Sequence, residues 1–543
     1  MMTFPMECHC LRSSEVPHTS KLYASYFDEF SPALAGFYAH PPTEEGLLAS
    51  AGEVKFDETL RARVVDILRE QNREFGADAS VSANLDRLAV GALTVVTGQQ
   101  VGLFGGPAYS FYKALSAIRA AQHLTDAGVE AVPVFWLATE DHDLAEVNHT
   151  FWLPRGAPLR RISVEAPADA EGRRVGDILL GESAAREARA AAESLEGPSS
   201  KEVGDALLAA YQPRHSYGRA FGLLMARLLA GRGVILLDPL DARLHRLGIA
   251  IYRRALDEGE TLGDALLKRN KALERGGFHA QVKVTERSTL LFVQVDGQRQ
   301  ALRRRNDGFA AGTRTFALDE LRALLERSPE IFSANVLLRP VLQDALLPTA
   351  ACVGGPAETA YFAQAEVLYR RLIGRMPAIL PRAGFTLVEP NVARIMGKYP
   401  FTFEEILRGR QYLRRKMERE YLPAGLTKKF AAGEKDLQKI LRGLRAPIGK
   451  LDKTLLGALE TAEQKMLYQF GKLRGKAGRA QNLRTGLLDE HERVLLDALV
   501  PHRDLQERSL NLLPFLARNG MFLLDELLHR THVRNSQHQV MFL

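Results

Sequence analysis

The sequence predicts an α/β protein with a parallel-sheet core, joined to an α-helical coiled-coil domain in its C-terminal part. Two short apolar runs, at 93–96 and 132–138, flank a helical pattern, and a strand, a helix and a strand in succession make a βαβ unit. Such units cross over right-handed in a parallel sheet. The coiled coil is predicted by an apolar heptad seam that consists of Leu437, Leu441, Leu444, Ile448, Leu451 and Leu455.

The other elements of the core follow from the same helix and strand periodicities. Residues 1–90 are expected to form a short tail and then helices, and residues 155–230, rich in Ala, Arg and Glu, an inserted helical layer. Further elements are predicted as strands at 234–239, 290–295 and 378–382, a helix over about 241–275, and a strand with a helix within 335–375. We therefore expect a core domain over 1–385 and a helical coiled-coil domain over 386–543.

Pro447 interrupts the heptad seam. Because proline lacks an N–H and clashes with the preceding turn, we expect a break there and a fresh helix from about 448 to 474. A second helix over about 486–499 would pair with it as an antiparallel hairpin. Residues 505–527 are predicted to form one more helical stretch before the end of the domain.

The charge distribution separates the two domains. Lys and Arg number 72 against 65 Asp and Glu, yet residues 401–490 alone hold 20 basic and 11 acidic residues. The remainder has 52 basic against 54 acidic residues, so the basic character belongs to the helical segment. Aromatic residues do not alternate regularly with these charges. We therefore interpret the segment as a solvated helical face and expect no nucleic-acid partner, although a nucleic-acid-binding coiled coil stays open as an alternative.

The overall composition, 46% hydrophobic and 25% charged, is that of an ordinary globular protein and excludes a disordered chain or a collagen. Three cysteines cannot build a disulfide framework, and they fit a reducing cytoplasm. The N-terminal residues lack a secretory signal pattern, and no run of about 18 apolar residues occurs. We expect a cytoplasmic protein without a membrane span.

A glycine-rich segment directly follows the first predicted strand. Backbone N–H groups in such a turn, together with the positive end of the next helix, favour an anion, although a tight structural turn is an equal alternative. The segment is neither a Walker loop nor a dinucleotide fingerprint. Two glutamine amides, a tyrosine and a lysine add polar groups, and the lysine could pair with a phosphate or lie in solvent. The candidate substrate-binding residues are Thr97, Gly98, Gln99, Gln100, Gly105, Gly106, Tyr109 and Lys113.

An acidic cluster follows the second predicted strand, where open α/β sheets place their ligands. Glu140, Asp141, His142 and Asp143 are the candidate catalytic residues, because carboxylates and a histidine can hold an amine and move its proton. Asn148 and His149 are candidate substrate-binding residues. Helix capping by Asp141 or Asp143 is the alternative. Since no standard zinc spacing occurs, we predict no metal ligands.

A third cluster lies within residues 335–375. Arg339 is a natural clamp for a carboxylate, and the glycines allow close approach of the backbone to a ligand. The alternative is a surface arginine beside a structural turn. Cys352 is more typical of an inert buried thiol than of a nucleophile. The candidate substrate-binding residues here are Arg339, Gln343, Asp344, Gly354, Gly355, Glu358 and Tyr361.

These clusters together resemble the cysteine ligase family of bacillithiol biosynthesis, BshC, and the resemblance extends over nearly the whole chain. It is carried, in the family's order, by TGQQVGLFGGPAYSFYKALSAIRAA, VPVFWLATEDHDLAEVNHTFW, GGFHAQV, NVLLRPVLQDALLPTAACVGGPAETAYFAQ and LQERSLNLLPFL. It implies a Rossmann-like core with connecting-peptide insertions and a coiled coil that makes a homodimer. It also implies an enzyme of the last step of bacillithiol synthesis, which joins L-cysteine to glucosaminyl-malate through the sugar amine.

The chain departs from the adenylating enzymes that share this kind of core. They carry a His-x-Gly-His box after the first strand and a Lys-Met-Ser-Lys-Ser-type loop later, whereas here the first position holds TGQQVGLFGGP and Lys416-Met417 is followed by Glu418-Arg419. ATP, with Mg²⁺ if ATP is used, is expected only because an amide formed from a free carboxylate needs activation. We expect no tightly bound cofactor. A nucleotidyltransferase or an aminoacyl-tRNA-synthetase-like enzyme with another acceptor is the alternative function.

Overall fold

The computed structural model describes residues 8–17, 19–306 and 308–543. The chain forms two compact units. The larger contains His9–Phe385 and Glu507–Gln539, and the smaller contains Thr386–Gln506 and Val540–Leu543. Each is described separately below.

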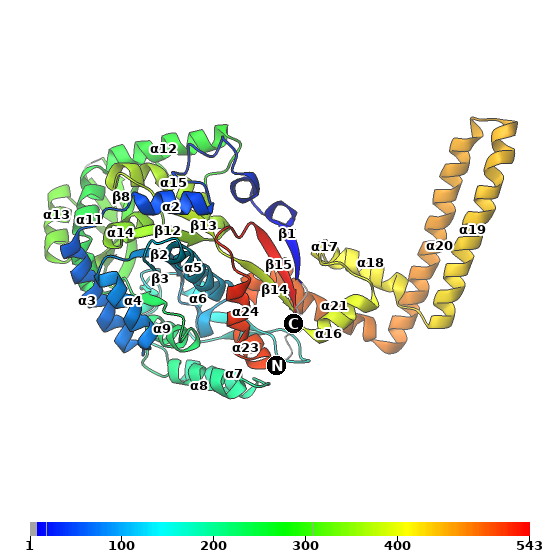
Figure 1. Cartoon of the computed structure of the whole chain (residues 1–543), viewed down its shortest axis with the longest axis horizontal. Helices are drawn as coiled ribbons and strands as arrows, with labels where there is room; N and C mark the ends of the chain where they lie inside the picture. The colour runs from blue at the N-terminus through cyan, green and yellow to red at the C-terminus, as the bar shows by residue number, and fades with distance from the viewer. Residues whose placement is uncertain (1–7, 18, 307) are drawn as a thin grey trace. The chain divides into compact units, whose positions relative to one another are not determined.

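A five-stranded parallel sheet forms the centre of the larger unit (Figure 1). Its strands are β13 (Ala378–Pro381), β12 (Thr349–Gly354), β2 (Leu93–Gln99), β3 (Ala131–Leu137) and β6 (Ile235–Leu237), in that spatial order. Every neighbouring pair is parallel. The predicted α/β core with its βαβ unit is therefore confirmed, with α5 (Tyr109–Asp126) as the crossover helix between β2 and β3.

Alternating side chains of these strands build two apolar layers, because successive residues of a strand point to opposite faces. Val95 packs with α2 (Glu44–Gly52) and α5, whereas Val96 belongs to the larger core on the other face. Helices from distant parts of the sequence pack in that larger core, among them α3 (Glu58–Glu74), α4 (Ala79–Ala89), α14 (Arg339–Leu346) and α15 (Pro356–Leu372). Burial on both faces explains why the strands are almost continuously apolar in sequence.

The first insertion follows β3 and is mainly helical, as predicted for 155–230. It begins with the short α6 (Leu144–Val147) and an antiparallel pair, β4 (His149–Trp152) and β5 (Arg160–Ser163). The helices then follow in the order α7 (Glu182–Glu193), α8 (Ser200–Ala210) and α9 (Tyr217–Leu228).

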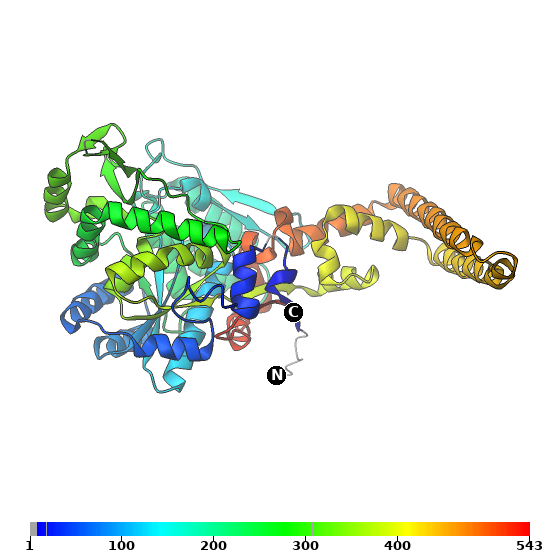
Figure 2. The ribbon, with the colours of Figure 1, turned by 90° about the horizontal axis from the view of Figure 1, so that it is seen from above.

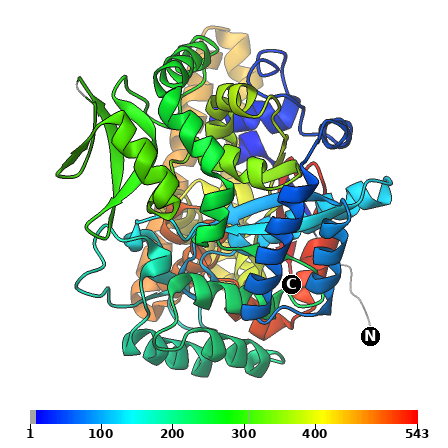
Figure 3. The same cartoon turned by 90° about the vertical axis from the view of Figure 1, so that its left-hand side faces the viewer.

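The second insertion lies between β6 and β12. The prediction of a single helix over 241–275 is wrong. The structure has three helices there, α10 (Ala242–Leu247), α11 (Ile249–Asp257) and α12 (Gly259–Arg275). The breaks fall at Gly248 and at Glu258–Gly259, where glycine weakens a continuous helix. An antiparallel sheet in the order β10-β9-β8-β7-β11 follows (Figure 3). It consists of β7 (Ser288–Val295), β8 (Gln298–Arg305), β9 (Gly308–Ala311), β10 (Arg314–Phe316) and β11 (Phe332–Ala334), with α13 (Leu318–Arg327) before β11.

The smaller unit is helical. It contains α16 (Pro390–Lys398), α17 (Phe403–Leu407), α18 (Arg410–Glu420), α19 (Ala424–Leu451), α20 (Leu455–Thr485) and α21 (Leu487–Leu499). Helices α19 and α20 lie side by side as an antiparallel hairpin (Figures 1 and 2), with Arg445 bonded to Glu460 and Phe430 against Phe470.

The prediction of a helix break at Pro447 is wrong. Helix α19 runs through Pro447 to Leu451, and the hairpin pairs α19 with α20 rather than 448–474 with 486–499. Pro447 lies in the last turns of the helix, so little helix follows the hydrogen bond that proline removes. The chain reverses instead at Asp452, whose carboxylate accepts from the Thr454 amide at 2.8 Å.

One segment of the predicted C-terminal domain, Glu507–Gln539, packs within the larger unit. It contains most of α22 (Gln506–Ser509), together with α23 (Leu513–Asn519) and α24 (Leu523–His529). Arg382 pairs with Glu507 at 2.6 Å, and Arg119 donates to the carbonyl of Thr531 at 3.0 Å. Strands β1 (Cys8–Arg12), β15 (Gln537–Phe542) and β14 (Gly384–Val388) form a small sheet, and the chain passes between the units within these strands.

Candidate functional site

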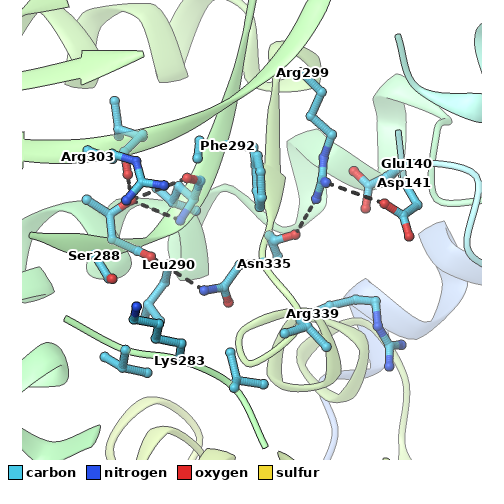
Figure 4. Close-up of a pocket in the computed structure, with 18 of the residues that line it drawn as sticks. Glu140, Asp141, Lys283, Ser288, Leu290, Phe292, Arg299, Arg303, Asn335 and Arg339 are labelled. Atoms are coloured by element: carbon cyan, nitrogen blue, oxygen red, sulfur yellow. Dashed lines mark hydrogen bonds and ion pairs between the residues drawn. The ribbon is translucent and has the colours of Figure 1, made fainter. Parts of the chain in front are cut away.

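A cavity of about 420 Å³ lies between the carboxyl end of β3 and the antiparallel sheet of the second insertion (Figure 4). Strand β3 is buried along its whole length, and the chain becomes polar immediately after it, at Thr139 and Glu140. Because side chains at the carboxyl end of a parallel strand leave the apolar layers, they are free to meet a ligand. The polar residues of the lining are Glu140, Asp141, His142, Lys283, Ser288, Thr289, Arg299, Arg303, Asn335 and Arg339.

Glu140 is a buried carboxyl in the wall of this cavity, with 5% of its surface exposed. Burial raises its pKa to about 7, against the opposing effect of the Arg299 and Arg174 charges. A carboxyl group that titrates near neutral pH can both accept and return a proton, which is the property of a general acid or base.

Asp141 stays ionised beside Glu140. Burial opposes its charge, but contacts from His142 and Gln100 and the charge of Arg299 hold the pKa of this carboxyl well below its usual range. Gln100 donates to Asp141 at 2.8 Å, and the backbone amide of His142 donates at 2.8 Å. Two adjacent carboxyl groups in one cavity therefore have opposite protonation tendencies, a pattern typical of sites that separate acid–base work from charge stabilisation.

Arg299 fixes the orientation of His142. Its guanidinium lies over the Phe292 ring, at 3.7 Å from the centroid, and donates to Ser333 and to the carbonyl of Ala334. A further guanidinium nitrogen lies 3.0 Å from Nδ1 of His142, whereas Asp141 is 3.5 Å from the same atom, at the limit of a hydrogen bond. Since arginine only donates, Nδ1 is the acceptor of this contact, which leaves Nε2 as the nitrogen that carries the N–H.

The predicted glycine-rich segment, residues 97–107, does not line this cavity. Gly105 and Gly106 have φ values of 87° and 69°, which favour glycine. Asn511 donates to the carbonyls of Phe104 at 2.8 Å and of Gly106 at 3.1 Å. These contacts support the structural-turn alternative, since the chain's own side chains bind the loop's polar groups.

The other predicted residues of that segment serve the sheet. A Cβ on Gly98 would lie 2.9 Å from the carbonyl oxygen of Trp136, so a side chain there would force β2 away from β3. Thr97 donates to the carbonyl of Val353 at 3.0 Å, and Gln99 donates to Tyr109 at 3.1 Å. Gln100 is the residue of this segment that connects it to the acidic cluster.

Lys113 is buried, with 4% of its surface exposed, and pairs with Glu358 at 2.5 Å. It also donates to the carbonyl of Gly98 and to Gln99. Glu358 accepts from the Gly355 amide at 2.8 Å, so it caps α15 as well. Both predicted ligand-binding charges are therefore occupied by each other in this structure.

The remaining predicted residues divide between cavity and interior. Arg339 lines the cavity and donates to Tyr361 at 2.9 Å. Gln343 and Asp344 lie in the interior, where Gln343 donates to Asp344 at 3.1 Å. Gly354 ends β12.

In the acidic cluster, Asp143 caps α6 by accepting from the Glu146 amide at 3.3 Å, as the capping alternative expects. Asn148 and His149 contact each other at 3.4 Å, at the start of β4. None of these three belongs to the lining of the cavity.

Sequence reasoning missed the wall contributed by the second insertion. Phe292, Arg299 and Arg303 come from β7 and β8, whose polar residues gave no strand signal beyond 290–295. The segment GGFHAQV, which ends one residue before Lys283, was the available indication that this region belongs to the site.

A second cavity, of about 1100 Å³, adjoins the first and shares Ala301 and Arg303 with it. Its lining is strongly basic, with four arginines and one glutamate. The arginines are Arg287, Arg303, Arg304 and Arg305, of which Arg304 lies 3.4 Å from Glu260. Such a lining favours an anionic ligand.

Within the described ranges, no group of three or more His, Cys, Asp or Glu side chains could hold a metal ion. Among the helices of the same ranges, none is long and apolar enough to cross a membrane.

Comparisons with known proteins assign the chain to a family. Residues 6–383 match the N-terminal Rossmann-like domain of the bacillithiol biosynthesis protein BshC, and residues 385–543 match its C-terminal coiled-coil domain. The chain is 41% identical to the BshC of Koribacter versatilis over 95% of this chain and 96% of that protein. It is 36% identical to the BshC of Solibacter usitatus, over 99% and 100%, and 32% identical to that of Salinibacter ruber, over 95% of each. These relatives carry a name that assigns them, provisionally, as cysteine ligases. Because both domain models match and the relatives align over nearly the full length of the chain, the chain belongs to the BshC family of bacillithiol biosynthesis.

Proposed function

We propose that this protein is a cysteine ligase of the last step of bacillithiol synthesis. It joins L-cysteine to glucosaminyl-malate, with an amide bond between the cysteine carboxyl carbon and the sugar amine nitrogen. The observation that carries this proposal is the charge distribution of the 420 Å³ cavity. Glu140 and Asp141 lie at one end, and Lys283 and Arg303 lie at the other (Figure 4).

This arrangement fits a substrate with an amine at one end and carboxylates at the other. The sugar ammonium is held by Asp141, which stays ionised, next to Glu140. The malate carboxylates face Lys283 and Arg303. Arg339 lines the cavity on the side of Glu140 and Asp141 (Figure 4). Leu290, Leu291 and Phe292 supply apolar contact for the carbon skeleton.

The reaction needs the ammonium to lose a proton before its nitrogen can attack. Glu140 accepts that proton, because its carboxyl titrates near neutral pH. His142 presents an Nε2–H that can donate to the carbonyl oxygen on which negative charge develops. The nitrogen then forms the amide as the activating group leaves with a carboxyl oxygen of cysteine.

We further propose that ATP supplies the activation, because a free carboxylate does not form an amide in water. The arginine-lined second cavity supports this proposal, since guanidinium groups bind phosphate oxygens well. Mg²⁺ then enters with the ATP phosphates. The enzyme acts in the cytoplasm as a homodimer through α19 and α20. The buried thiol of Cys352, which carries no disulfide, fits a reducing compartment.

The test is product formation by the purified full chain. With L-cysteine, glucosaminyl-malate and ATP we expect bacillithiol by mass spectrometry, and we expect none when any one of the three is omitted. The nucleotide product, AMP or ADP, identifies the activated intermediate. Absence of product, together with unchanged bacillithiol in a deletion strain, would refute the proposal. Amino-acid-dependent nucleotide exchange with a different acceptor would support the alternative transferase.

A further inference from the structure

A second buried titratable side chain lies directly behind Glu140, outside the cavity lining. His245, on α10, has 3% of its surface exposed. Its Nε2 lies 3.5 Å from Oε1 of Glu140, at the limit of a hydrogen bond, and neither atom has hydrogen-bond geometry with any described group. Buried polar atoms without partners are costly, so each of these two atoms is the nearest candidate partner of the other.

The surroundings hold His245 in this place. Its ring stacks on Tyr252, with 12° between the ring planes, and its Nδ1 lies 3.4 Å from the tyrosine hydroxyl. Tyr252 is itself fully buried on α11. The imidazole therefore has one nitrogen toward Tyr252 and the other toward Glu140.

We propose that His245 is a positioning residue for the amide-forming reaction, which orients the Glu140 carboxyl through Nε2–H and favours the ionised form that takes a proton from the attacking amine. This inference rests on the proposed function. The ammonium loses one proton to the Glu140 carboxylate, which becomes a carboxylic acid, and the nitrogen keeps its electron pair for the attack. The new proton lies on the other carboxyl oxygen, while Nε2–H of neutral His245 stays directed at Oε1, until the proton passes from Glu140 to water.

The electrostatics of the pair agree with a neutral imidazole that donates to Glu140. Burial lowers the pKa of His245 to about 4, reinforced by Arg174 and opposed by Asp241 and the carbonyls of Pro239 and Phe332. The imidazole is therefore neutral at the pH where Glu140 titrates. The charged groups that face Glu140 from the elements around it are Arg299, Arg174, Asp238 and Arg339, and Tyr252 lies close as well.

The direction of the effect follows from hydrogen-bond strength. A neutral imidazole can give its N–H to a carboxylate or accept from a carboxylic acid, and the bond to the charged carboxylate is the stronger of the two. His245 thus stabilises ionised Glu140 more than protonated Glu140. Without the imidazole, the pKa of Glu140 should rise.

The experiment is a pH profile of kcat/KM for bacillithiol formation by the full chain. In the wild type we expect activity to rise with pH through about 7, as Glu140 ionises. His245→Phe keeps a ring that can stack on Tyr252 but removes the donor. We expect its rising limb to move up by about one pH unit, with about fivefold less activity at pH 7 that recovers toward pH 9. His245→Gln keeps an amide donor and should move the limb less.

The outcomes separate the two proposals. If the wild type forms no bacillithiol, the proposed function fails. If the wild type is active and His245→Phe lowers activity equally at every pH, the role is structural packing and the inference is wrong. Should His245→Phe not fold, as judged by its melting temperature, a ¹³C-glutamate NMR titration of Glu140 in wild type and His245→Gln gives the same answer. An identical Glu140 pKa in the two proteins would overturn the inference.

Discussion

At the scale of single residues, the most informative group is the buried Glu140. Its pKa, raised to about 7, means that the folded protein holds a proton that the unfolded chain releases near pH 4.5. Folding stability therefore falls as pH rises from about 4.5 to 7, because the unfolded state binds fewer protons across this window. A residue that serves catalysis in this way destabilises the fold at neutral pH.

Glu140→Gln tests both consequences. We expect bacillithiol formation to fall at least about a hundredfold, because the amide cannot accept the proton. We expect the free energy of unfolding at pH 8 to rise by about 3 kcal/mol, with the difference vanishing near pH 4. Urea unfolding at the two pH values measures it. Glu146→Gln, an exposed carboxyl of the same cluster, is the control and should show no such pH-dependent gain.

Lys113 and Glu358 show the opposite use of buried charge. The ion pair joins α5 to the start of α15. Lys113 also donates to the Gly98 carbonyl, and Glu358 also accepts from the Gly355 amide. Removal of one partner leaves the other charge buried and unpaired. We expect Lys113→Met to lower the free energy of unfolding by about 3 kcal/mol, and Lys113→Met with Glu358→Gln to lower it less than the sum of the single changes. Urea denaturation of the four proteins measures this coupling. Additive losses would show that the two charges do not stabilise each other.

At the scale of elements, the strength of the sequence signal decided what could be predicted. Strands β2 and β3 were visible because burial on both faces made them continuous apolar runs. Strand β8 reads Gln-Arg-Gln-Ala-Leu-Arg-Arg-Arg, and its charges hid a strand that faces two cavities. Arg299 lies 157 residues from its contact His142, a pairing that no local pattern reveals. Glu140, Asp141 and His142 were predictable because they end an apolar strand.

The loop between β2 and α5 shows how a distant element completes a local turn. Nδ2 of Asn511 donates to the carbonyls of Phe104 and Gly106 and lies 3.1 Å from the Thr150 hydroxyl, while its Oδ1 accepts from the Leu513 amide. Its segment therefore packs with the larger unit, within the range 385–543 that matches the C-terminal domain of the family.

Asn511→Ala removes these bonds and leaves buried carbonyls unpaired. We expect the free energy of unfolding to fall by about 2 to 3 kcal/mol, seen as a lower urea midpoint. Asn519→Ala is the matched control, since that side chain donates locally to the Phe515 carbonyl within its own helix. Equal losses in the two variants would argue against a special role for Asn511 in holding the loop.

At the scale of the whole molecule, the hairpin of α19 and α20, called the helical arm below, carries an apolar surface that its own two helices leave exposed. Leu444, Leu451 and Leu455 belong to the predicted seam, yet 43%, 80% and 42% of their surfaces are exposed, whereas Leu441 is buried. Exposed leucines at heptad spacing are typical of a coiled-coil face that another helix covers. We propose that a second copy of the same arm covers this face. The charged residues beside it would then lie in solvent, which accounts for the excess of basic over acidic residues in 401–490.

Leu444→Glu combined with Leu451→Glu should therefore separate the copies. A symmetric dimer places each substitution at the interface twice. Each buried leucine contributes about 1.5 to 3 kcal/mol to association, so the two substitutions remove enough binding free energy to dissociate a dimer of moderate affinity. Sedimentation equilibrium should give twice 60.2 kDa for the wild type and 60.2 kDa for the variant, with unchanged helix content by circular dichroism. Lys439→Ser with Lys450→Ser, two exposed changes on the same helix, should stay dimeric.

A wild type that sediments as a monomer at every concentration would contradict the homodimer, and a dimeric leucine variant would place the interface elsewhere. Because the proposed catalytic groups all come from one larger unit, we expect the monomeric variant to keep most of its activity.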